Sequence, residues 1–166
     1  EFDGIINYLT KKTGGNIHDN GTVEVTNNSI NSIGTHPKNL FDLNKDNYYH
    51  SKSRNLDIWF CFDFKNFEIE ISSYSLKSSS GYGANQGNFR NWVVEVSNDG
   101  QNWTKIDEHS NYSELNEKNI IRNFKVNPNN FSRYCRIRHT GEYWGYNQNY
   151  CLKLGCVEFY GRIKEE

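Results

Sequence analysis

The 166-residue sequence has no methionine, only two prolines and no long apolar run. These absences bear on where translation starts, on whether a helix could span a membrane and on the secondary structure. Without an initiator methionine, Glu1 is not a translation start, so we expect a single domain excised from a larger protein. No apolar run approaches the ~18–20 residues that a membrane-spanning helix needs. Pro37 and Pro128 fall in expected connections, and no window shows the spacing of an amphipathic helix. The chain is therefore expected to consist mainly of strands.

Charge and motifs exclude several functional classes. The net charge is −1, so no global field attracts nucleic acid or an anionic membrane. The sequence lacks the motifs of zinc proteases, dithiol redox centres, serine hydrolases and phosphate-binding loops. Residues 81–87, GYGANQG, are glycine-rich, but no helix follows them to bind a phosphate. We therefore expect a binding protein and not an enzyme.

The four cysteines bear on the cellular compartment. An even number permits two disulfides in an oxidising compartment. However, all four lie within strand-like segments, where a free cysteine packs as a small hydrophobic residue. We therefore favour free thiols, and a cytoplasmic rather than an extracellular location, for Cys61, Cys135, Cys151 and Cys156.

Residues 88–109, NFRNWVVEVSNDGQNWTKIDEH, give the clearest structural signal. Asn98-Asp99-Gly100 separates two segments of alternating polarity, which is the strongest short-range sign of a hairpin. A hairpin with one apolar face must bury that face against another sheet. Aromatic residues make up 15% of the chain, and large rings suit such a β-rich interior. We expect Trp59, Trp92 and Trp103 to lie in this core.

Further alternating segments predict an antiparallel sandwich or barrel. Within 68–78 the pattern switches, so that Ile69, Ile71 and Ser73 are expected on one face, and Tyr74 and Leu76 follow the switch. Residues 36–43, HPKNLFDL, could form one helical turn. The additional strands are expected at 21–26, 58–64, 68–78, 119–126, 131–139 and 151–161.

The lengths of the connections indicate where a ligand would bind. Neighbouring antiparallel strands alternate in direction, so successive connections fall at alternate ends of the sandwich. The tight links at 66, 98–100 and 127–130 share one end. Because long loops on a rigid scaffold often form binding sites, we expect a pocket at the opposite end. The long links at that end are 43–57, 79–89, 109–118 and 140–150.

Several of these segments together resemble the coagulation factor 5/8 type C, or discoidin-like, domain of the galactose-binding-domain-like superfamily. The resemblance covers nearly the whole chain and is carried by WFCFDF, EISSYSLKS, NFRNWVVEVSNDGQNW, RYCRIRHTGEYW and VEFYG. It implies an all-β fold over 1–166, an eight-stranded antiparallel jelly-roll β-sandwich with long binding loops at one end. Members bind sugars, phospholipid headgroups or proteins. This chain lacks the terminal cysteine pair of extracellular members and the apolar spikes of membrane-binding members, so a lipid partner is not expected.

The resemblance and the loop composition lead to two functional hypotheses. The first is a non-catalytic module that binds carbohydrate, a galactose-like sugar, and the alternative is an intracellular protein-interaction module that uses the same loops. A sugar ring would stack on Trp144 or Tyr82, while arginine, asparagine and histidine side chains read its hydroxyls. The candidate ligand-binding residues are His36, His50, Tyr82, Asn85, Arg90, His139 and Trp144.

Each candidate also has a purely structural interpretation. Arg90 could pair with an acidic residue of a neighbouring strand, and each histidine could stabilise a loop. Trp144 could instead cover the end of the sandwich.

A metal site is a further hypothesis. Asp42, Asn44 and Asp46 alternate along the chain and offer the oxygen ligands that calcium favours, although Ser53 stands where an EF-hand requires glutamate. Related sugar-binding modules hold a structural calcium near this part of the fold. The residues could thus hold a structural calcium, and the alternative is an ordinary polar turn. We expect that the domain requires no cofactor.

Overall fold

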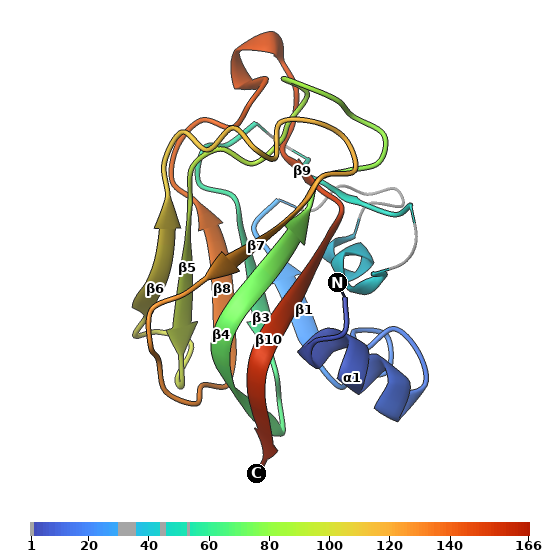
Figure 1. Cartoon of the computed structure of the whole chain (residues 1–166), viewed down its shortest axis with the longest axis vertical. Coiled ribbons are helices and arrows are strands. Elements are labelled where there is room, and N and C mark those ends of the chain that lie inside the picture. The colour runs from blue at the N-terminus through green and yellow to red at the C-terminus, as the bar shows by residue number, and fades with distance from the viewer. Residues whose placement is uncertain (1, 30–35, 44–45, 53) are drawn as a thin grey trace.

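The computed structural model describes residues 2–29, 36–43, 46–52 and 54–166. Two antiparallel sheets pack face to face, one of five strands in the order β1-β3-β8-β5-β6 and one of three in the order β10-β4-β7 (Figure 1). A two-residue pair, β2-β9, adds a third small sheet. The predicted all-β antiparallel sandwich is confirmed, and its two main sheets together hold the expected eight strands.

The structure sets the bounds of these elements. The strands are β1 (Glu24–Asn27), β2 (Tyr49–His50), β3 (Trp59–Asp63), β4 (Phe67–Lys77), β5 (Trp92–Ser97), β6 (Thr104–His109), β7 (Ile121–Lys125), β8 (Tyr134–His139), β9 (Lys153–Leu154) and β10 (Cys156–Glu165). The helices are α1 (Ile5–Thr13) and the short 3-10 helices η1 (Pro37–Phe41) and η2 (Tyr146–Gln148). The helical turn predicted within 36–43 is therefore present as η1, whereas the single strand expected at 151–161 is divided at Gly155 into β9 and β10.

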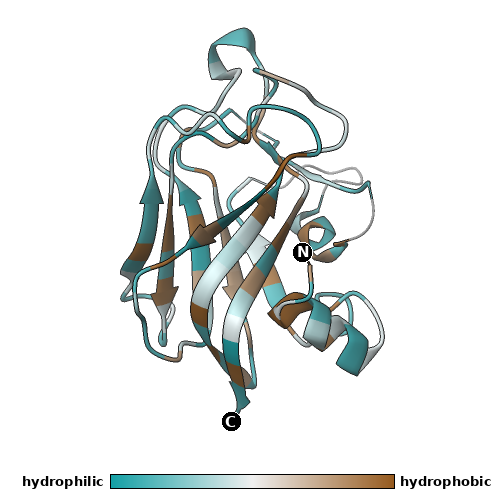
Figure 2. Cartoon of the chain, viewed as in Figure 1, coloured by the Kyte–Doolittle hydropathy of each residue, from teal (hydrophilic) through white to brown (hydrophobic). Residues whose placement is uncertain are grey.

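Aromatic rings fill the space between the sheets, as their abundance predicts. In Figure 2 hydrophobic and hydrophilic residues alternate along the strands, while the long loops are mostly hydrophilic. Trp92 is fully buried, and its indole Nε1 donates to the hydroxyl of Tyr74 at 2.9 Å. That hydroxyl donates to a carboxylate oxygen of Asp107 at 2.6 Å. A hydrogen-bonded chain thus joins β5 and β6 of one sheet to β4 of the other.

Strand β4 changes face through a β-bulge. Its pairing with β10 places Ile71 opposite Gly161 but Ser73 opposite Tyr160, so the residue between them is unpaired. A bulge shifts the alternation by one residue. Before it the odd-numbered residues face the core, and after it the even-numbered ones do, beginning with Tyr74. The predicted switch within 68–78 is confirmed, but it comes before Ser73, which therefore does not share the face of Ile69 and Ile71.

The interpretation that no window of the sequence forms an amphipathic helix is wrong for α1. The helix buries only Ile5, Ile6 and Leu9, so its apolar pattern is too brief to stand out in the sequence. Its N-cap residue, Gly4, provides no side-chain cap. The cap comes instead from Glu158 of β10, which lies 152 positions from Ile6 along the chain.

The Glu158 carboxylate is completely buried and accepts four backbone hydrogen bonds. One oxygen accepts from the N–H groups of Ile6 at 2.7 Å and Phe159 at 2.8 Å, and the other from Gly4 and Asn7 at 3.0 Å each. Burial raises the pKa of this carboxyl, while the four N–H groups act in the opposite direction. A negative charge at a helix N-terminus also interacts favourably with the helix dipole. Glu158 therefore fixes α1 onto β10.

Two of the three tryptophans predicted in the core are only half-buried. Trp59 begins β3 on the outer face of the five-stranded sheet, because Phe60 is the residue that points inward. Trp103 precedes β6, and the guanidinium of Arg136 lies 4.1 Å from its ring centroid. The core assignment is confirmed for Trp92 alone.

The candidate ligand residue His139 lies inside the sandwich, with 1% of its surface exposed. Its ring meets that of Phe89 edge-on at 4.8 Å, and its Nε2 lies 3.5 and 3.4 Å from the backbone nitrogens of Arg90 and Asn91. Burial lowers the pKa of His139 to about 3. It therefore supports the backbone that carries Arg90 and does not reach a ligand itself.

The alternation of short and long connections is confirmed. The links from β3 to β4, β5 to β6 and β7 to β8 lie at the lower end in Figure 1, and the loops 79–89, 109–118 and 140–150 lie at the upper end with β9. The fourth long link, 43–57, contains β2, which pairs with β9, and residues 44, 45 and 53 of this link lie outside the described part of the chain. We call the upper end the loop end. Among the described residues, no helix has the length and apolarity needed to cross a membrane.

Replacing Glu158 tests the distant cap. In Glu158→Gln the amide nitrogen cannot accept the two hydrogen bonds that one carboxylate oxygen takes. Urea denaturation should show a loss of about 3 kcal/mol in the free energy of unfolding. The control is Glu108→Gln, which removes an ion pair with Lys105 in which both side chains are about half exposed, and which should change stability little. Equal stabilities for the two variants would contradict the cap.

The buried histidine predicts a dependence of stability on pH. The pKa of His139 in the folded chain lies below its ordinary value of 6.5, so the unfolded chain takes up the proton first as the pH falls. This group should therefore cost about 2–3 kcal/mol of stability between pH 6.5 and 4.5. When the free energy of unfolding from urea denaturation is plotted against pH over that range, it should fall less steeply for His139→Gln than for the wild type. An equal pH dependence of the free energy of unfolding in the two proteins would show that His139 does not titrate as a buried group.

Candidate functional site

At the loop end, the loops 79–89 and 140–150 are joined by their backbones. The N–H of Gly87 donates to the carbonyl of Trp144 at 2.7 Å, and the N–H of Trp144 donates to that of Asn88 at 3.0 Å. Gly145 has φ of 92°, and a Cβ there would collide with the backbone carbonyl of Asn85. Only glycine combines that backbone conformation with so close an approach. The Trp144 side chain is therefore held by a defined backbone.

The candidate Asn85 joins loop 79–89 to loop 109–118. Its backbone N–H donates to the side-chain oxygen of Asn116 at 2.8 Å, and the Asn116 amide donates back to the Asn85 side chain at 3.0 Å. Both side chains are exposed or half-buried, so their remaining hydrogen-bonding positions face solvent. Asn85 thus has a structural role that the sequence did not indicate.

Arg90 and Trp144, predicted independently as ligand contacts, touch one another. The guanidinium carbon of Arg90 lies 4.2 Å from the Trp144 ring centroid. Its Nε donates to the side-chain oxygen of Asn111 at 2.9 Å. The Trp144 indole donates to the carbonyl of Tyr112 at 2.7 Å, and the Tyr112 N–H donates to the carbonyl of Arg90 at 2.9 Å. We call Arg90, Asn111, Tyr112 and Trp144 the Arg90 cluster.

Among the described residues, Arg90 does not pair with an acidic residue of a neighbouring strand, which was its alternative structural interpretation. Within the described part of the chain, Arg90 forms no ion pair, and only its Nε and backbone atoms have hydrogen-bond partners. The rest of its donors, on the two Nη nitrogens, remain available in a half-buried side chain. One face of the half-buried Trp144 ring is covered by the guanidinium.

A second group of candidates gathers around a lysine that sequence reasoning missed. The Lys153 side chain is buried, with its ammonium 4.1 Å from the Tyr82 ring centroid and 5.2 Å from that of Tyr150. It donates to the backbone carbonyls of Gln86 and Cys151 at 3.1 and 3.0 Å. Burial lowers the pKa of this ammonium to about 8. The sequence signal was a lone lysine between two leucines in CLKLG.

Tyr48 and His50 complete this second group, which we call the Lys153 cluster together with Tyr82, Tyr150 and Lys153. The Tyr48 and Tyr82 rings meet edge-on at 5.6 Å, and the His50 ring lies 6.4 Å from that of Tyr82. Burial, and then the Lys153 charge, lower the pKa of His50. The Arg90 and Lys153 clusters flank the same loop, 79–89, so the loop end offers aromatic rings beside neutral and cationic donors.

His36 does not join these clusters. It caps η1, where its Nδ1 accepts from the N–H of Lys38 at 3.0 Å, and its ring lies 4.9 Å from that of His18. Burial and then the neighbouring His18 and Lys38 lower the pKa of His36. His36 therefore acts as the loop-stabilising residue that was its alternative interpretation.

The described residues do not favour the calcium site. The two Asp42 carboxylate oxygens accept from the amides of Asn16 at 3.2 Å and Asn47 at 2.8 Å, which places N–H groups where a cation would bind. Asn44 lies outside the described residues. Elsewhere in 2–29, 36–43, 46–52 and 54–166, no three His, Cys, Asp or Glu side chains gather as a metal site.

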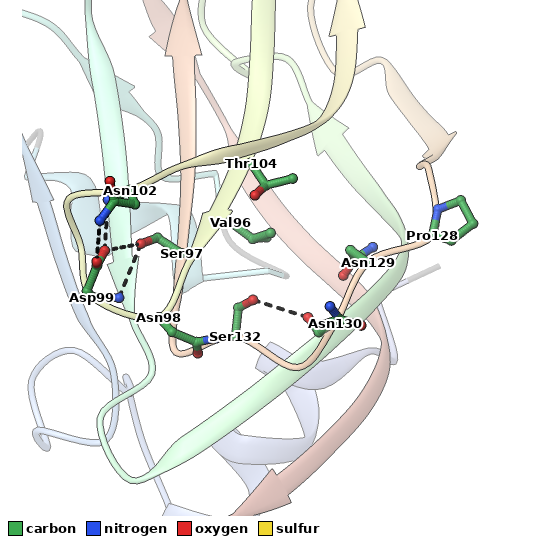
Figure 3. Close-up of a pocket in the computed structure, with 10 residues that line it drawn as sticks. All are labelled: Val96, Ser97, Asn98, Asp99, Asn102, Thr104, Pro128, Asn129, Asn130 and Ser132. Carbon is green, nitrogen blue, oxygen red and sulfur yellow. Dashed lines mark hydrogen bonds between the residues drawn. The ribbon is translucent and has the colours of Figure 1, made fainter.

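A cavity of about 560 Å³ opens at the opposite end of the sandwich, between the β5–β6 turn and the β7–β8 link (Figure 3). Its one charged group, Asp99, accepts from the Ser97 hydroxyl and from the N–H groups of Gln101 and Asn102. The Asn129 amide is bonded to the backbone of β4. Because these groups stabilise the turns themselves, we place the candidate site at the loop end.

Comparison with solved structures shows what this fold is similar to. The complex of CpGH89CBM32-5 from Clostridium perfringens with GalNAc-β-1,3-galactose has a TM-score of 0.66 at 19% identity, and the match covers 85% of this chain and 96% of that one. The family 32 carbohydrate-binding module of C. perfringens NanJ, in complex with galactose, has a TM-score of 0.65 at 12% identity, and the match covers 87% of this chain and 95% of that one. A chitosan-binding module of Paenibacillus sp. IK-5 has a TM-score of 0.63 at 19% identity, and the match covers 84% of this chain and 96% of that one. These three structures share the fold.

Sequence comparison identifies the family. An E3 ubiquitin-protein ligase, Ufd4 of Drosophila melanogaster, is 30% identical over 118 residues, which are 69% of this chain. The chain spans only 4% of the length of that ligase. Residues 16–155 match the F5/8 type C domain, so the match includes both clusters and every strand except β10. The chain belongs to the F5/8 type C domain family.

Proposed function

We propose that the loop end binds carbohydrate, a galactose-like sugar, without catalysis. The observation that carries the proposal is the Arg90 cluster, where a guanidinium is held over the face of an indole from an adjoining loop. A sugar ring stacks its C–H face on an aromatic ring while planar donors read its hydroxyls. The galactose and GalNAc-galactose complexes of similar fold support this choice.

Titration calorimetry with methyl galactoside tests the proposal. Trp144→Ala should weaken binding about tenfold, because it removes the stacking surface. Trp103→Ala is a matched control, since Arg136 covers Trp103 at 4.1 Å as Arg90 covers Trp144 at 4.2 Å, but at the opposite end of the sandwich. Equal losses in the two variants would argue against a site at the loop end.

A protein-interaction module is the second candidate, favoured by the 30% identity to a ubiquitin ligase. The four cysteines are free thiols, and burial raises the pKa of Cys61 to about 11 and of Cys156 to about 12, which agrees with the cytoplasmic location that we propose. A pull-down from source lysate should lose its partner with Arg90→Ala and Trp144→Ala but retain it with Trp103→Ala. Retention by all three variants would exclude this surface.

The calcium hypothesis has a direct test. The amide donors at Asp42 lead us to expect no metal there, so adding millimolar calcium should leave the melting temperature unchanged. A rise that Asp42→Asn abolishes would restore the metal site.

A further inference from the structure

The inference concerns the charge of the ligand and rests on the proposed function. The sequence has seven arginines. Five of them pair with carboxylates at 2.8–3.4 Å: Arg122, Arg133, Arg136, Arg138 and Arg162. Arg54 and Arg90 form no ion pair within the described residues, and both lie at the loop end. Arg54 instead contacts Tyr146. Its Nη1 donates to the backbone carbonyl of Tyr146 at 3.4 Å, and its guanidinium carbon lies 5.9 Å from the centroid of the Tyr146 ring.

Of these two, Arg90 is the one that the fold holds in place. Its Nε is bonded to Asn111, whose own N–H donates to the side-chain oxygen of Asn91 at 2.8 Å. Its guanidinium plane rests on Trp144, and the indole is fixed in turn by the carbonyl of Tyr112. Little conformational entropy remains to be lost when a ligand binds such a side chain.

The partner that holds Arg90 is neutral. The Asn111 amide oxygen satisfies one donor and leaves the positive charge uncompensated. A half-buried guanidinium with both Nη groups available matches a carboxylate in shape and charge, and the paired hydrogen bonds are stronger than those to a hydroxyl. Elsewhere in the described chain, arginines of similar exposure already have that carboxylate.

The overall charge limits how large an anion can be. At a net charge of −1 the domain has no extended positive field for a polyanion or an anionic membrane. A single carboxylate on an otherwise neutral ligand is what one fixed arginine can recognise. We propose that the Arg90 cluster selects sugars that carry a carboxylate, with a hexuronic acid residue as the ligand class and Arg90 as the residue that reads its charge.

Methyl galactoside and methyl galacturonide form a matched pair of probes, because they differ only in a CH₂OH or a carboxylate at C6. Titration calorimetry at low salt should show the galacturonide binding about tenfold more tightly. The preference should shrink as sodium chloride is raised. Equal affinities would overturn the inference while leaving carbohydrate binding in place. Binding of neither sugar would overturn the inference together with the proposed function.

Two substitutions test the assignment to Arg90. Arg90→Gln should abolish the preference. Asn111→Asp should abolish it as well, because it keeps Arg90 but supplies a carboxylate at the position of an amide oxygen 2.9 Å away. Arg122→Gln removes the same charge from an arginine paired with Glu114 and should keep the tenfold ratio. Retention of the ratio in Asn111→Asp, with an unchanged melting temperature, would assign the preference to another residue.

Discussion

The hydrogen-bonded chain from Trp92 through Tyr74 to Asp107 is the interaction on which the rest of the structure depends. It crosses the interior from one sheet to the other and satisfies an indole and a hydroxyl that would otherwise be buried without partners. Burial alone would raise the pKa of the Asp107 carboxyl, but hydrogen bonds from His109 and Tyr74 keep it below its ordinary value. A fully satisfied polar chain of this kind fixes one relative placement of the sheets.

The same chain leads to the candidate site. The Tyr112 ring packs edge-on against Trp92 at 5.5 Å, and the Tyr112 backbone then bonds both Arg90 and the Trp144 indole. His139 supports the backbone before β5 from the other side. The guanidinium at the surface is therefore positioned by the packing of the core, and not by the loops alone. This is how long loops can present a side chain in a fixed orientation.

Sequence reasoning anticipated the features that follow from local alternation. The Asn98-Asp99-Gly100 turn, the switch of face in β4 and the end of the sandwich with the long loops all follow from period-two patterns and connection lengths. It failed where a residue's environment is set by distant partners. Trp103, for example, is covered by Arg136 from another strand. His139 is a different case, because the alternation in β8 places it inward with Cys135 and Ile137, and it was nevertheless predicted as a ligand contact. The Arg90 cluster joins three loops, so no single segment contains its pattern.

Helix α1 shows why the limits of a family match need not be the limits of a folding unit. The match covers 16–155, but Glu158 accepts from Gly4, Ile6 and Asn7 on one side and from Phe159 on the other. Strand β10 is an edge strand, and a Cβ at Gly4 would collide with the carbonyl of Phe159, so the first residues lie directly against that edge. A fragment that began at residue 16 but kept β10 would leave that edge open for pairing with other chains. The segment before the match is thus a guard against aggregation.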